Sequence, residues 1–474
     1  MSSEWPIVKI DDIKADVKNA ITIGPFGSRM KSDCYVNLGI PVIRGTNLGP
    51  TSVFVNDFVY ISVEKANELA SCNVYKGDLV FPHRGSIGEV GIVEHDKRYV
   101  LSSSLMKLTC NPCKACPKYI YYFFKSNIGR HELLKNSSQV GTPGIGQPLS
   151  SLKAIELFLP PLRIQQKIAS TLGELDEKIN LNWRINQTLE QMAQALFKSW
   201  FVDFEPVKAK MAVLEAGGSQ EDATLAAMTA ISGKDANALA VFEREQPVQY
   251  AELKATAELF PSAMQDSELG DIPEGWSIKQ LDEIATYQNG LALQKFRPEN
   301  ESDFLPVVKI AQLKKGFADG EEKASPNIKP ECIIDNGDVV FSWSGSLMVD
   351  IWCGGRAALN QHLFKVSSSR YPKWLYYKYT THHLIEFQRI AEAKAVTMGH
   401  IKREHLSQAK CLIPAAETVH AFTPFFEPVL NKIISNRLET RKLENIRDTL
   451  LPKLLSGEIT LPEAEQAVSE AENV

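Results

Sequence analysis

The chain has 474 residues, of which 44% are hydrophobic, and a formal net charge of -5, which is an ordinary globular composition. One hydrophobic core seldom organises so long a chain, so we expect two or more domains. No apolar run approaches the ~20 residues that a membrane span needs, and the N-terminus lacks a basic-then-apolar leader. We therefore expect no membrane partner and a cytoplasmic location.

The acidic charge is concentrated in two segments. Residues 206–276 hold 5 Lys and Arg against 12 Asp and Glu, and residues 457–474 hold 0 against 5. Residues 1–160 (18 against 14) and 277–415 (18 against 15) are mildly basic. The negative net charge therefore does not exclude nucleic acid, because two blocks remain that could approach phosphate.

The first part of the chain is predicted to form short strands separated by turn residues. Examples are PVIRG (41–45), GDLVF (77–81) and VGIVE (90–94), and a helix is expected around residues 119–134. This pattern predicts an α/β domain over residues 1–160.

A candidate metal motif lies within this domain. Cys110, Cys113 and Cys116 form C-x-x-C-x-x-C. A tetrahedral site needs a fourth ligand, which the sequence does not place, and the matching stretch later in the chain, FKVSSSRYP, has no cysteine. We expect no metal here and favour a surface turn after a strand.

A change of period after Pro160 and Pro161 indicates a long helix over residues 161–205. Its apolar residues recur at the three- and four-residue spacing of a helix seam. They are Ile168, Leu172, Leu175, Ile179, Leu189, Met192 and Leu196. The acidic connector 206–270 follows, and its helix formers are interrupted at Gly217-Gly218, so a helical and a partly disordered connector both stay open.

The rest of the chain repeats the first part. WPIVKIDDI matches WSIKQLDEI, GDLVFPHRGSIG matches GDVVFSWSGSLM, and KYIYYFF matches KWLYYKY. The repeat predicts a second α/β domain over residues 271–415, a distal helix over residues 416–457 and an acidic tail over residues 458–474. The expected fold is therefore α/β, with two tandem α/β domains separated by two long antiparallel helices in an internal pseudo-twofold repeat.

One polar residue interrupts each helix seam, Asn182 in the first and Asn436 in the second. The seam of the second helix lies 254 residues further on, at Phe422, Phe426, Val429, Ile433, Leu443, Ile446 and Leu450. If the helices pair antiparallel, we expect the two asparagines to meet and hydrogen-bond, which would fix the register. The alternative is two independent amphipathic helices with exposed asparagines.

The chain resembles the specificity (S) subunits of type I restriction-modification enzymes. LNWRINQTLEQMAQALFKSWFVDFEPVKAKM (181–211) is similar to their central region, LENIRDTLLPKLLSGEI (443–459) to their distal region, and ELGDIPEGW (268–276) to the entry of their second variable domain. Together with the two GD(L/V)VF phrases, the resemblance covers nearly the whole chain.

The resemblance implies two target recognition domains that each read half of a split sequence in double-stranded DNA and are held apart by the conserved helices. Such subunits are not enzymes and hold no cofactor. They recruit two modification subunits, which methylate adenine with S-adenosylmethionine, and two restriction subunits, which use ATP and Mg. FLPPLR (158–163) lacks the polar and aromatic residues of an adenine methyltransferase motif, and no G-x-x-x-x-G-K-[ST] phosphate loop occurs.

Base edges are read by polar side chains on loops held against a groove. In the first domain the expected DNA-binding residues are Lys31, Arg44, Arg84, Ser86 and Thr142. In the second domain they are Lys309, Gln312, Ser344, Ser346, Gln361 and Thr397.

Structural interpretations of these residues stay open. Arg44 could pair with a carboxylate, Lys31 could be solvated, and the Gly85-Ser86 pair could simply close a hairpin. We expect His83 to be a loop side chain, whereas Trp343 could belong to a core or stack on a DNA sugar.

Two apolar groups are candidates for binding the modification subunits. Phe197, Trp200, Phe201 and Phe204 cluster at the end of the first helix, and Leu454 and Leu455 occupy the matching place at the end of the second. The alternative is that the aromatic cluster caps the core of the first domain.

Two other functions remain possible. An enzyme fused to this architecture would need catalytic motifs and a further domain, which the sequence does not offer. An interaction scaffold of the same fold without sequence-specific DNA reading is the second alternative.

Overall fold

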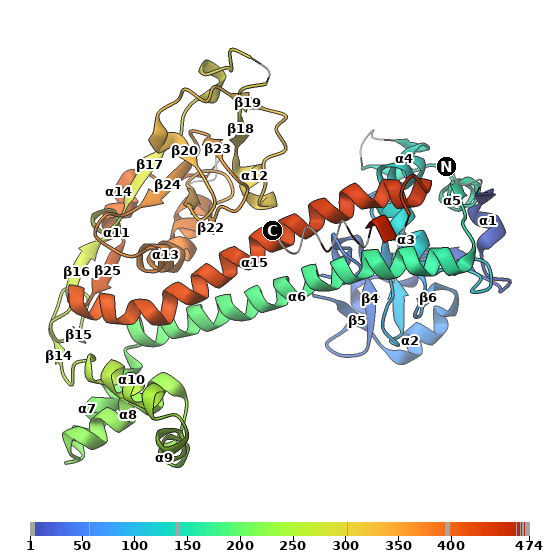
Figure 1. Cartoon of the computed structure of the whole chain (residues 1–474). Coiled ribbons are helices and arrows are strands. Elements are labelled where there is room, and N and C mark those ends of the chain that lie inside the picture. The colour runs from blue at the N-terminus through green and yellow to red at the C-terminus, as the bar shows by residue number, and fades with distance from the viewer. Residues whose placement is uncertain are drawn as a thin grey trace. The chain divides into compact units, whose positions relative to one another are not determined.

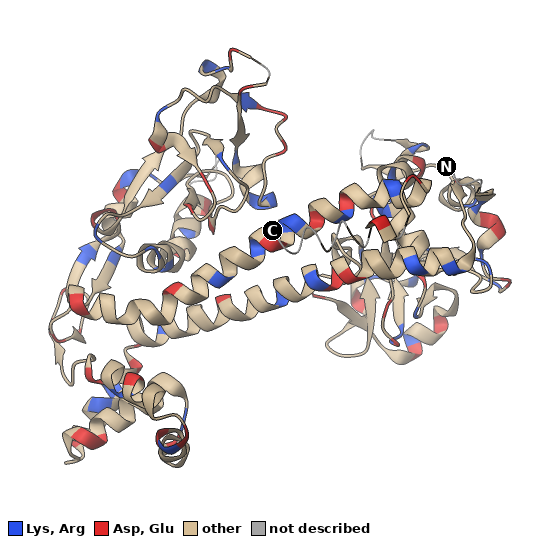
Figure 2. Cartoon of the chain, viewed as in Figure 1, with Lys and Arg blue, Asp and Glu red and all other residues tan. Residues whose placement is uncertain are grey.

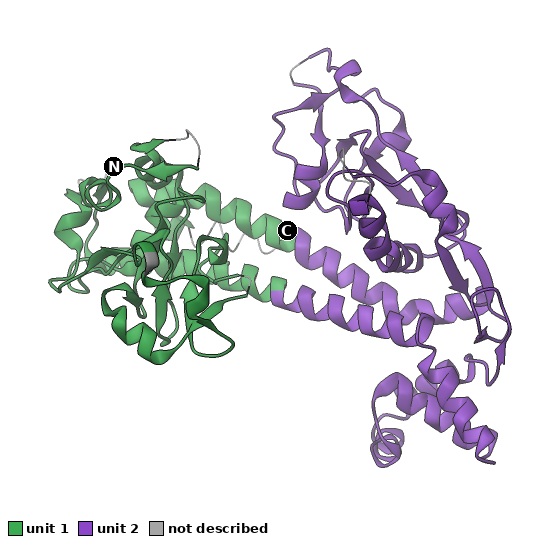
Figure 3. Ribbon diagram, turned by 180° about the vertical axis from the view of Figure 1, so that it is seen from behind, with its two compact units in different colours: residues 1–183, 439–474 green, residues 184–438 purple. Residues whose placement is uncertain are grey.

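The structure is a computed structural model that describes residues 5–55, 57–138, 142–300, 302–393, 399–460, 462–464, 466 and 469. It divides into two compact units (Figure 3). The first comprises residues 1–183 and 439–474, and the second comprises residues 184–438. Each unit contains one α/β lobe, called here the first lobe (residues 5–160) and the second lobe (residues 271–415).

The first lobe is built on two small sheets. One has the strand order β3-β5-β4-β9-β6, and its members are Tyr35–Val36, Val59–Ile61, Ile40–Ile43, Tyr99–Leu101 and Asn73–Val74. The other has the order β2-β10-β7-β8, with Ile21–Ile23, Leu105–Leu108, Leu79–Pro82 and Gly91–Ile92. β4 and β9 are parallel, and the other pairs within these sheets are antiparallel.

Short helices and two outer strand pairs complete the first lobe (Figure 1). The helices are α1 (Ile10–Ile13), α2 (Val63–Glu68), α3 (Pro117–Lys125), α4 (Asn127–Leu134) and α5 (Pro148–Ala154). β1 (Ile7–Lys9) pairs antiparallel with β13 (Glu156–Phe158), and β11 (Ser137–Ser138) pairs with β12 (Gly144–Ile145). Six consecutive apolar or aromatic residues of α3, from Tyr119 to Phe124, are buried, so α3 is a core helix of this lobe.

The second lobe repeats this plan. One sheet has the order β17-β24-β21-β22, with Thr286–Asn289, Leu363–Ser367, Val339–Ser342 and Met348–Ile351. The other has the order β19-β18-β23-β20, with Lys323–Ala324, Leu305–Val308, Ala357–Leu359 and Ile333–Ile334. β18 and β23 are parallel, as β4 and β9 are in the first lobe.

The outer strands of the second lobe include a counterpart of the β1–β13 pair and a further strand pair at the entry of the lobe. β16 (Ser277–Gln280) pairs antiparallel with β25 (Lys410–Ile413), and β14 (Met264–Gln265) pairs with β15 (Ile272–Pro273). The helices are α11 (Leu281–Ile284), α12 (Ile310–Lys315), α13 (Lys373–Ala393) and α14 (Arg403–Gln408). The predicted fold of two tandem α/β lobes is confirmed.

A long helix follows each lobe, α6 (Leu162–Phe201) and α15 (Ala416–Ser456). In the first unit Leu175 and Ile179 pack against Leu443, and in the second unit Asn186 Nδ2 donates to the Ile433 carbonyl at 3.2 Å. Within each unit α6 and α15 lie side by side and antiparallel (Figure 1), and both basic and acidic residues are interspersed along them (Figure 2).

The expected hydrogen bond between Asn182 and Asn436 is wrong. Asn182 Nδ2 donates to Glu439 Oε2 at 3.1 Å, whereas Asn436 Nδ2 donates to Asn186 Oδ1 at 2.9 Å. Asn186 lies four residues, about one helical turn, beyond Asn182. Both asparagines are buried in the helix pairing, but the register is about one turn away from the expected one.

The acidic connector is helical. It forms α7 (Glu205–Glu215), α8 (Gln220–Ser232), α9 (Ala236–Glu245) and α10 (Pro247–Glu258). Its small core contains Ala227, Met228, Leu239, Leu253 and Ala257. The Lys210 ammonium group is buried and donates to the carbonyls of Ala257 (3.0 Å) and Phe260 (2.6 Å), which fixes α7 against the end of α10.

Candidate nucleic-acid interface

The repeated Gly-Asp phrase forms the same tight turn in both lobes. Gly77 has a φ of +89°, a conformation that strongly favours glycine. The Asp78 carboxylate closes the turn by accepting from the Tyr75 backbone N at 2.9 Å, and the buried Lys107 ammonium group lies 3.5 Å from it. These residues therefore set the backbone that leads into β7.

The second lobe reproduces this turn with the same residue types. Gly337 has a φ of +90°, and the Asp338 carboxylate accepts from the Asp335 backbone N at 2.8 Å. Lys365 Nζ lies 2.8 Å from the same carboxylate. The identical Gly-Asp residues of the phrase thus form a structural turn. The residues that differ lie further along, in the loop after the strand.

In each lobe three loops meet at one edge of the two sheets. Because β4 and β9 are parallel, their carboxyl ends lie at the same edge. β10 starts there, and its antiparallel partner β7 ends there. The second lobe repeats this with β18, β23, β24 and β21. We call this the loop edge of each lobe.

Backbone hydrogen bonds hold the predicted residues of the first lobe together at the loop edge. Gly85 N donates to the Pro143 carbonyl at 2.9 Å, which places the exposed side chains of Arg84, Ser86 and Thr142 near one another. Gly45 lies against Ser86, which brings the neighbouring Arg44 to the same edge.

Arg44 and Lys31 differ in how they are held. Arg44 Nη2 donates to the Asp57 carbonyl at 2.9 Å, so its described partner is a backbone oxygen and not a carboxylate. Lys31 is exposed in the loop between β2 and β3. Among the described residues, no hydrogen bond connects the Lys31 side chain to the Arg84 loop.

The second lobe holds Ser344 and Gln361 through His362. Ser344 Oγ lies 3.1 Å from His362 Nδ1, and Gln361 Nε2 lies 3.4 Å from His362 Nε2. Gln361 and His362 are exposed, whereas only 7% of Ser344 is exposed. Ser346 is exposed and accepts from Lys314 Nζ at 3.0 Å. The buried Ser344 therefore faces a neighbouring side chain and not the surroundings.

Of the other predicted residues of the second lobe, two contact neighbouring groups of the chain and one is not among the described residues. Lys309 Nζ pairs with Glu322, and Gln312 Oε1 accepts from the Lys309 backbone N at 3.3 Å. Thr397 lies outside the described residues.

His83 and Trp343 occupy equivalent positions just before the differing loop residues. His83 is buried, its Nε2 lies 3.1 Å from the Ser103 carbonyl, and burial lowers the pKa of its ring below the ordinary value. Trp343 is half-buried and packs against His362, with ring centroids 5.8 Å apart. Both side chains contribute to local packing.

Sequence reasoning missed His362 and Lys314. His362 follows the predicted Gln361, and Lys314 follows the predicted Gln312 by two residues. The available signal was the repeat itself, because the duplicated strands bring the loop of His362 and the short helix α12 of Lys314 to one edge.

The cysteine motif lies away from the loop edge, between β10 and α3. Cys110 is buried, Cys113 is exposed and Cys116 is half-buried. Burial raises the pKa of the Cys110 thiol to about 12, which favours a neutral thiol over a metal-binding thiolate.

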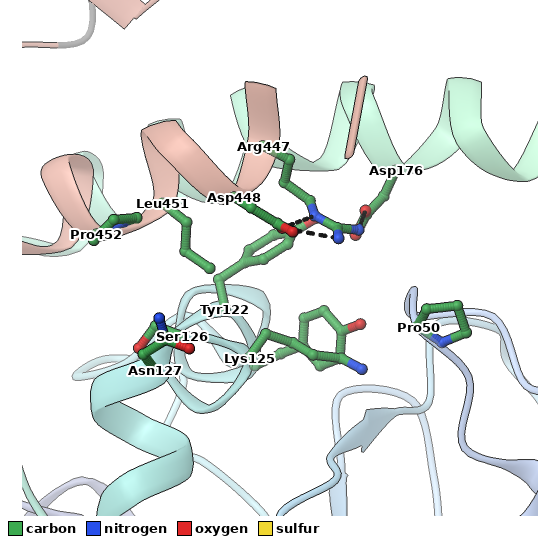
Figure 4. Close-up of a pocket in the computed structure, with 11 residues that line it drawn as sticks. Pro50, Tyr122, Lys125, Ser126, Asn127, Asp176, Arg447, Asp448, Leu451 and Pro452 are labelled. Carbon is green, nitrogen blue, oxygen red and sulfur yellow. Dashed lines mark hydrogen bonds and ion pairs between the residues drawn. The ribbon is translucent and has the colours of Figure 1, made fainter. Parts of the chain in front are cut away.

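A polar hollow of about 250 Å³ lies in the first unit, beside α3, α6 and α15 (Figure 4). Tyr122 donates to Asp176 at 2.8 Å, and Arg447 Nη1 lies 2.8 Å from the same carboxylate. Arg447 Nη2 also pairs with Asp448 at 2.9 Å. Because these charges are mutually compensated, the group is a buried ion network that supports the helix pairing.

The predicted partner-binding residues are buried within the chain's own cores, so we withdraw them as a docking surface. Phe197, Trp200, Phe201 and Phe204 are at most 7% exposed and join the core of the second lobe. Leu454 and Leu455 are at most 5% exposed and join the core of the first lobe. Capping of the first core by the aromatic cluster is also wrong, because α6 runs antiparallel to α15 and ends at the second lobe.

Comparison with known proteins supports the DNA-facing interpretation. The family model for the type I restriction modification DNA specificity domain matches residues 3–191 and 273–446. The chain is 28% identical to the type I restriction enzyme HindI specificity subunit of Haemophilus influenzae, over 96% of this chain and 100% of that protein. It is 26% identical to the MjaIX specificity subunit of Methanocaldococcus jannaschii, over 97% and 94%.

A solved structure shares the fold. The S subunit of a type I restriction-modification system from M. genitalium matches with a TM-score of 0.50 and 14% identity, over 95% of this chain and 96% of that one. Since the family model covers well over half of the residues, the chain belongs to the type I restriction-modification DNA specificity family, and it is a non-catalytic specificity subunit, as predicted.

Proposed function

We propose that this specificity subunit reads a bipartite DNA sequence, with one half-site read by each lobe. The observation that carries the proposal is the equivalence of the two loop edges. Each edge lies at the end of a strand that begins with the same Gly-Asp turn and has the same strand pairings, while the side chains presented there differ. Two equivalent frames with different polar residues suit the recognition of two different base sequences.

The proposed DNA-binding residues are those predicted above, with different weights. Arg84, Ser86 and Thr142 are exposed together at the loop edge of the first lobe, and Ser346 and Gln361 are exposed at that of the second. Ser344, Lys309 and Gln312 are held by neighbouring groups. We therefore assign them supporting roles.

The division of labour in the assembled complex is also proposed. The lobes at residues 1–160 and 271–415 act as target recognition domains, and helices 161–205 and 416–457 hold them apart. Two methyltransferase subunits that use S-adenosylmethionine and two restriction subunits that use ATP and Mg are the proposed partners, in the cytoplasm. The connector 206–270 and the tail 458–474 lie outside the reading lobes.

Mapping methylated adenines tests the proposal most directly. DNA from a host that expresses this chain with its partner subunits should carry methylation in a motif split into two short parts. A continuous short motif would contradict reading by two separate lobes. A scaffold without DNA reading, which family membership disfavours, would direct no methylation to a defined sequence.

Arg84→Ala identifies the half-site read by the first lobe. If Arg84 makes a bidentate guanine contact, its loss should reduce discrimination at one base of one half-site by about 1–3 kcal/mol. Selection from randomised duplexes measures this change. A uniform loss across all sequences, with a smaller salt dependence, would indicate a phosphate contact instead.

A further inference from the structure

The two loop edges can be aligned residue by residue through their backbone hydrogen bonds. In the first lobe His83 N donates to the Ser104 carbonyl at 2.9 Å, and in the second Trp343 N donates to the His362 carbonyl at 3.4 Å. Ser104 and His362 both directly precede the strand that pairs with β7 or β21. Residue 83 therefore pairs with residue 104 just as residue 343 pairs with residue 362, so positions 84 and 344 are equivalent, as are positions 104 and 362.

A second strand contact confirms this alignment. Arg84 forms an isolated bridge with Gly144, and Ser344 forms the corresponding bridge with His400. The hydrogen bond from Gly85 N to the Pro143 carbonyl likewise has a counterpart from Gly345 N to the Gly399 carbonyl, both at 2.9 Å. The two loop edges therefore share one backbone arrangement at these positions.

At these positions long and short side chains are exchanged between the lobes. In the first lobe the long residue, Arg84, is exposed on the loop after β7, and the residue beside it is the half-buried Ser104. In the second lobe the loop after β21 supplies the short, buried Ser344, and the long, exposed residue beside it is His362. At these two positions each edge therefore presents one long polar side chain, but from opposite loops.

His362 is held in one orientation by its neighbours. Ser344 Oγ contacts Nδ1 at 3.1 Å, Gln361 Nε2 lies 3.4 Å from Nε2, and the Trp343 ring packs nearby. A neutral imidazole offers one donor and one acceptor, and the hydrogen bond at one ring nitrogen determines which is which. Ser344 holds Nδ1, and the contact of the exposed Gln361 amide with Nε2 is long, so a base edge that displaces this amide can form a hydrogen bond with Nε2.

We propose that His362 is the principal base-reading residue of the second lobe, in the role that Arg84 has in the first, and that Ser344 positions it. This proposal rests on the proposed function, since it requires both loop edges to face DNA. In the repeated phrase Ser344 occupies the place of Arg84. In function, however, the counterpart of Arg84 is His362 and not Ser344.

The test uses the full chain and selection from randomised duplexes that contain two half-sites. His362→Ala should relax preference at one base of one half-site by roughly 5- to 150-fold, the usual range for loss of one good base contact. The half-site that Arg84→Ala affects should be unchanged. Because His362 is exposed, the thermal unfolding midpoint should stay at the wild-type value.

Two further variants separate positioning from direct contact. Ser344→Ala should relax the same base position as His362→Ala but by a smaller factor, and Ser344→Thr should restore the preference because it keeps the hydroxyl. His95→Ala is the matched control. His95 is an exposed histidine that precedes β9, at the edge of the first lobe opposite the loop edge, and its loss should leave both half-sites unchanged.

Several outcomes would overturn the proposal. They are an unchanged preference for His362→Ala, a change in the half-site that Arg84 reads, and a uniform fall in affinity with a smaller salt dependence. The last result would place His362 on phosphate. Failure of the wild-type chain to enrich any split sequence would instead refute the proposed function, so the two failures are distinguishable.

Discussion

In the first unit α3 meets α6 and α15 through a buried ion network, whereas in the second unit the equivalent α13 meets them through aromatic rings. Asp176 is paired with Tyr122 and Arg447 in the first. In the second, Trp374 stacks on Phe426 with centroids 4.4 Å apart. The two junctions serve one architecture with different physical chemistry.

The repeat offset of 254 residues shows how the difference arose in the sequence. Asp176 aligns with Leu430, and Arg447 aligns with Ala193, so both members of the ion pair correspond to apolar residues in the other unit. The polar junction borders a hollow of about 250 Å³, whereas the aromatic junction leaves about 10 Å³. In the polar junction the charged groups leave a space that water can occupy. In the aromatic junction the rings fill the equivalent space.

Trp200→Ala should give the largest effect, because it removes a fully buried ring from the aromatic core that joins α6 to α15 beside this junction. Trp200 is fully buried, with Phe260, Phe422 and Phe426 within 5.7 Å between ring centroids. Its truncation should lower the free energy of unfolding of the second unit by about 3–5 kcal/mol. Denaturant unfolding followed by near-UV circular dichroism measures the change. A loss below 1 kcal/mol would mean that the rings do not support this junction.

Asp176→Ala should destabilise the polar junction by about 2–3 kcal/mol, less than complete breakage of a fully buried pair, because Arg447 keeps Asp448 as a partner. The loss also leaves the buried Tyr122 hydroxyl without its acceptor. Denaturant unfolding of the full chain measures this effect.

The double variant Asp176→Leu with Arg447→Ala transfers the apolar residues of the second junction to the first. Because it removes both charges together, it should be more stable than Asp176→Leu alone. Equal stability of the double and single variants would show that the ion pair itself contributes little.

Low pH should reduce the stability of the second unit through protonation of His383. Burial is the main cause that lowers the pKa of His383 from 6.5 to about 4, and the Phe387 ring lies nearby. Because the unfolded chain binds this proton more readily, stability falls as the pH drops below about 6.5, by about 2 kcal/mol at pH 5. His383→Gln should remove this part of the loss between pH 7.5 and pH 5, as measured by denaturant unfolding at both values.

The corresponding position of the first lobe serves as the contrast. Ile128 aligns with His383 at the offset of 255 that relates the two lobes here, and it cannot titrate. Ile128→Ala should therefore leave the pH dependence of unfolding at its wild-type value. An altered slope in that variant, or an unaltered one in His383→Gln, would remove His383 as the cause.

The lobes and long helices could be predicted from the sequence because strand and helix periodicities are local and the repeat gave two independent readings of each element. The register of α6 and α15 could not. Which residue faces Asn182 depends on how far one helix slides along the other, and the packing of both lobes sets that distance. The burial of Trp200 in the core of the second lobe was not predicted either, because periodicity does not indicate toward which lobe a helix runs.

The candidate site was predictable as a location and less so as a set of contacts. Arg84 and Ser344, which differ between the two copies of the Gly-Asp phrase, lie at the loop edges of their lobes. The burial of Ser344 beneath His362 depends on a contact between loops 18 residues apart in the chain, which no local pattern encodes. The individual DNA contacts stay predictions.

The pairing of β1 with β13, and of β16 with β25, has an evolutionary consequence. Each lobe enters and leaves through adjacent antiparallel strands, so the chain can be cut at two neighbouring points to remove a whole lobe. Recombination that joins a different lobe at these strands would replace one half of the target sequence and leave the long helices intact. A host could thus acquire a new DNA specificity in a single genetic exchange, without redesigning the rest of the subunit.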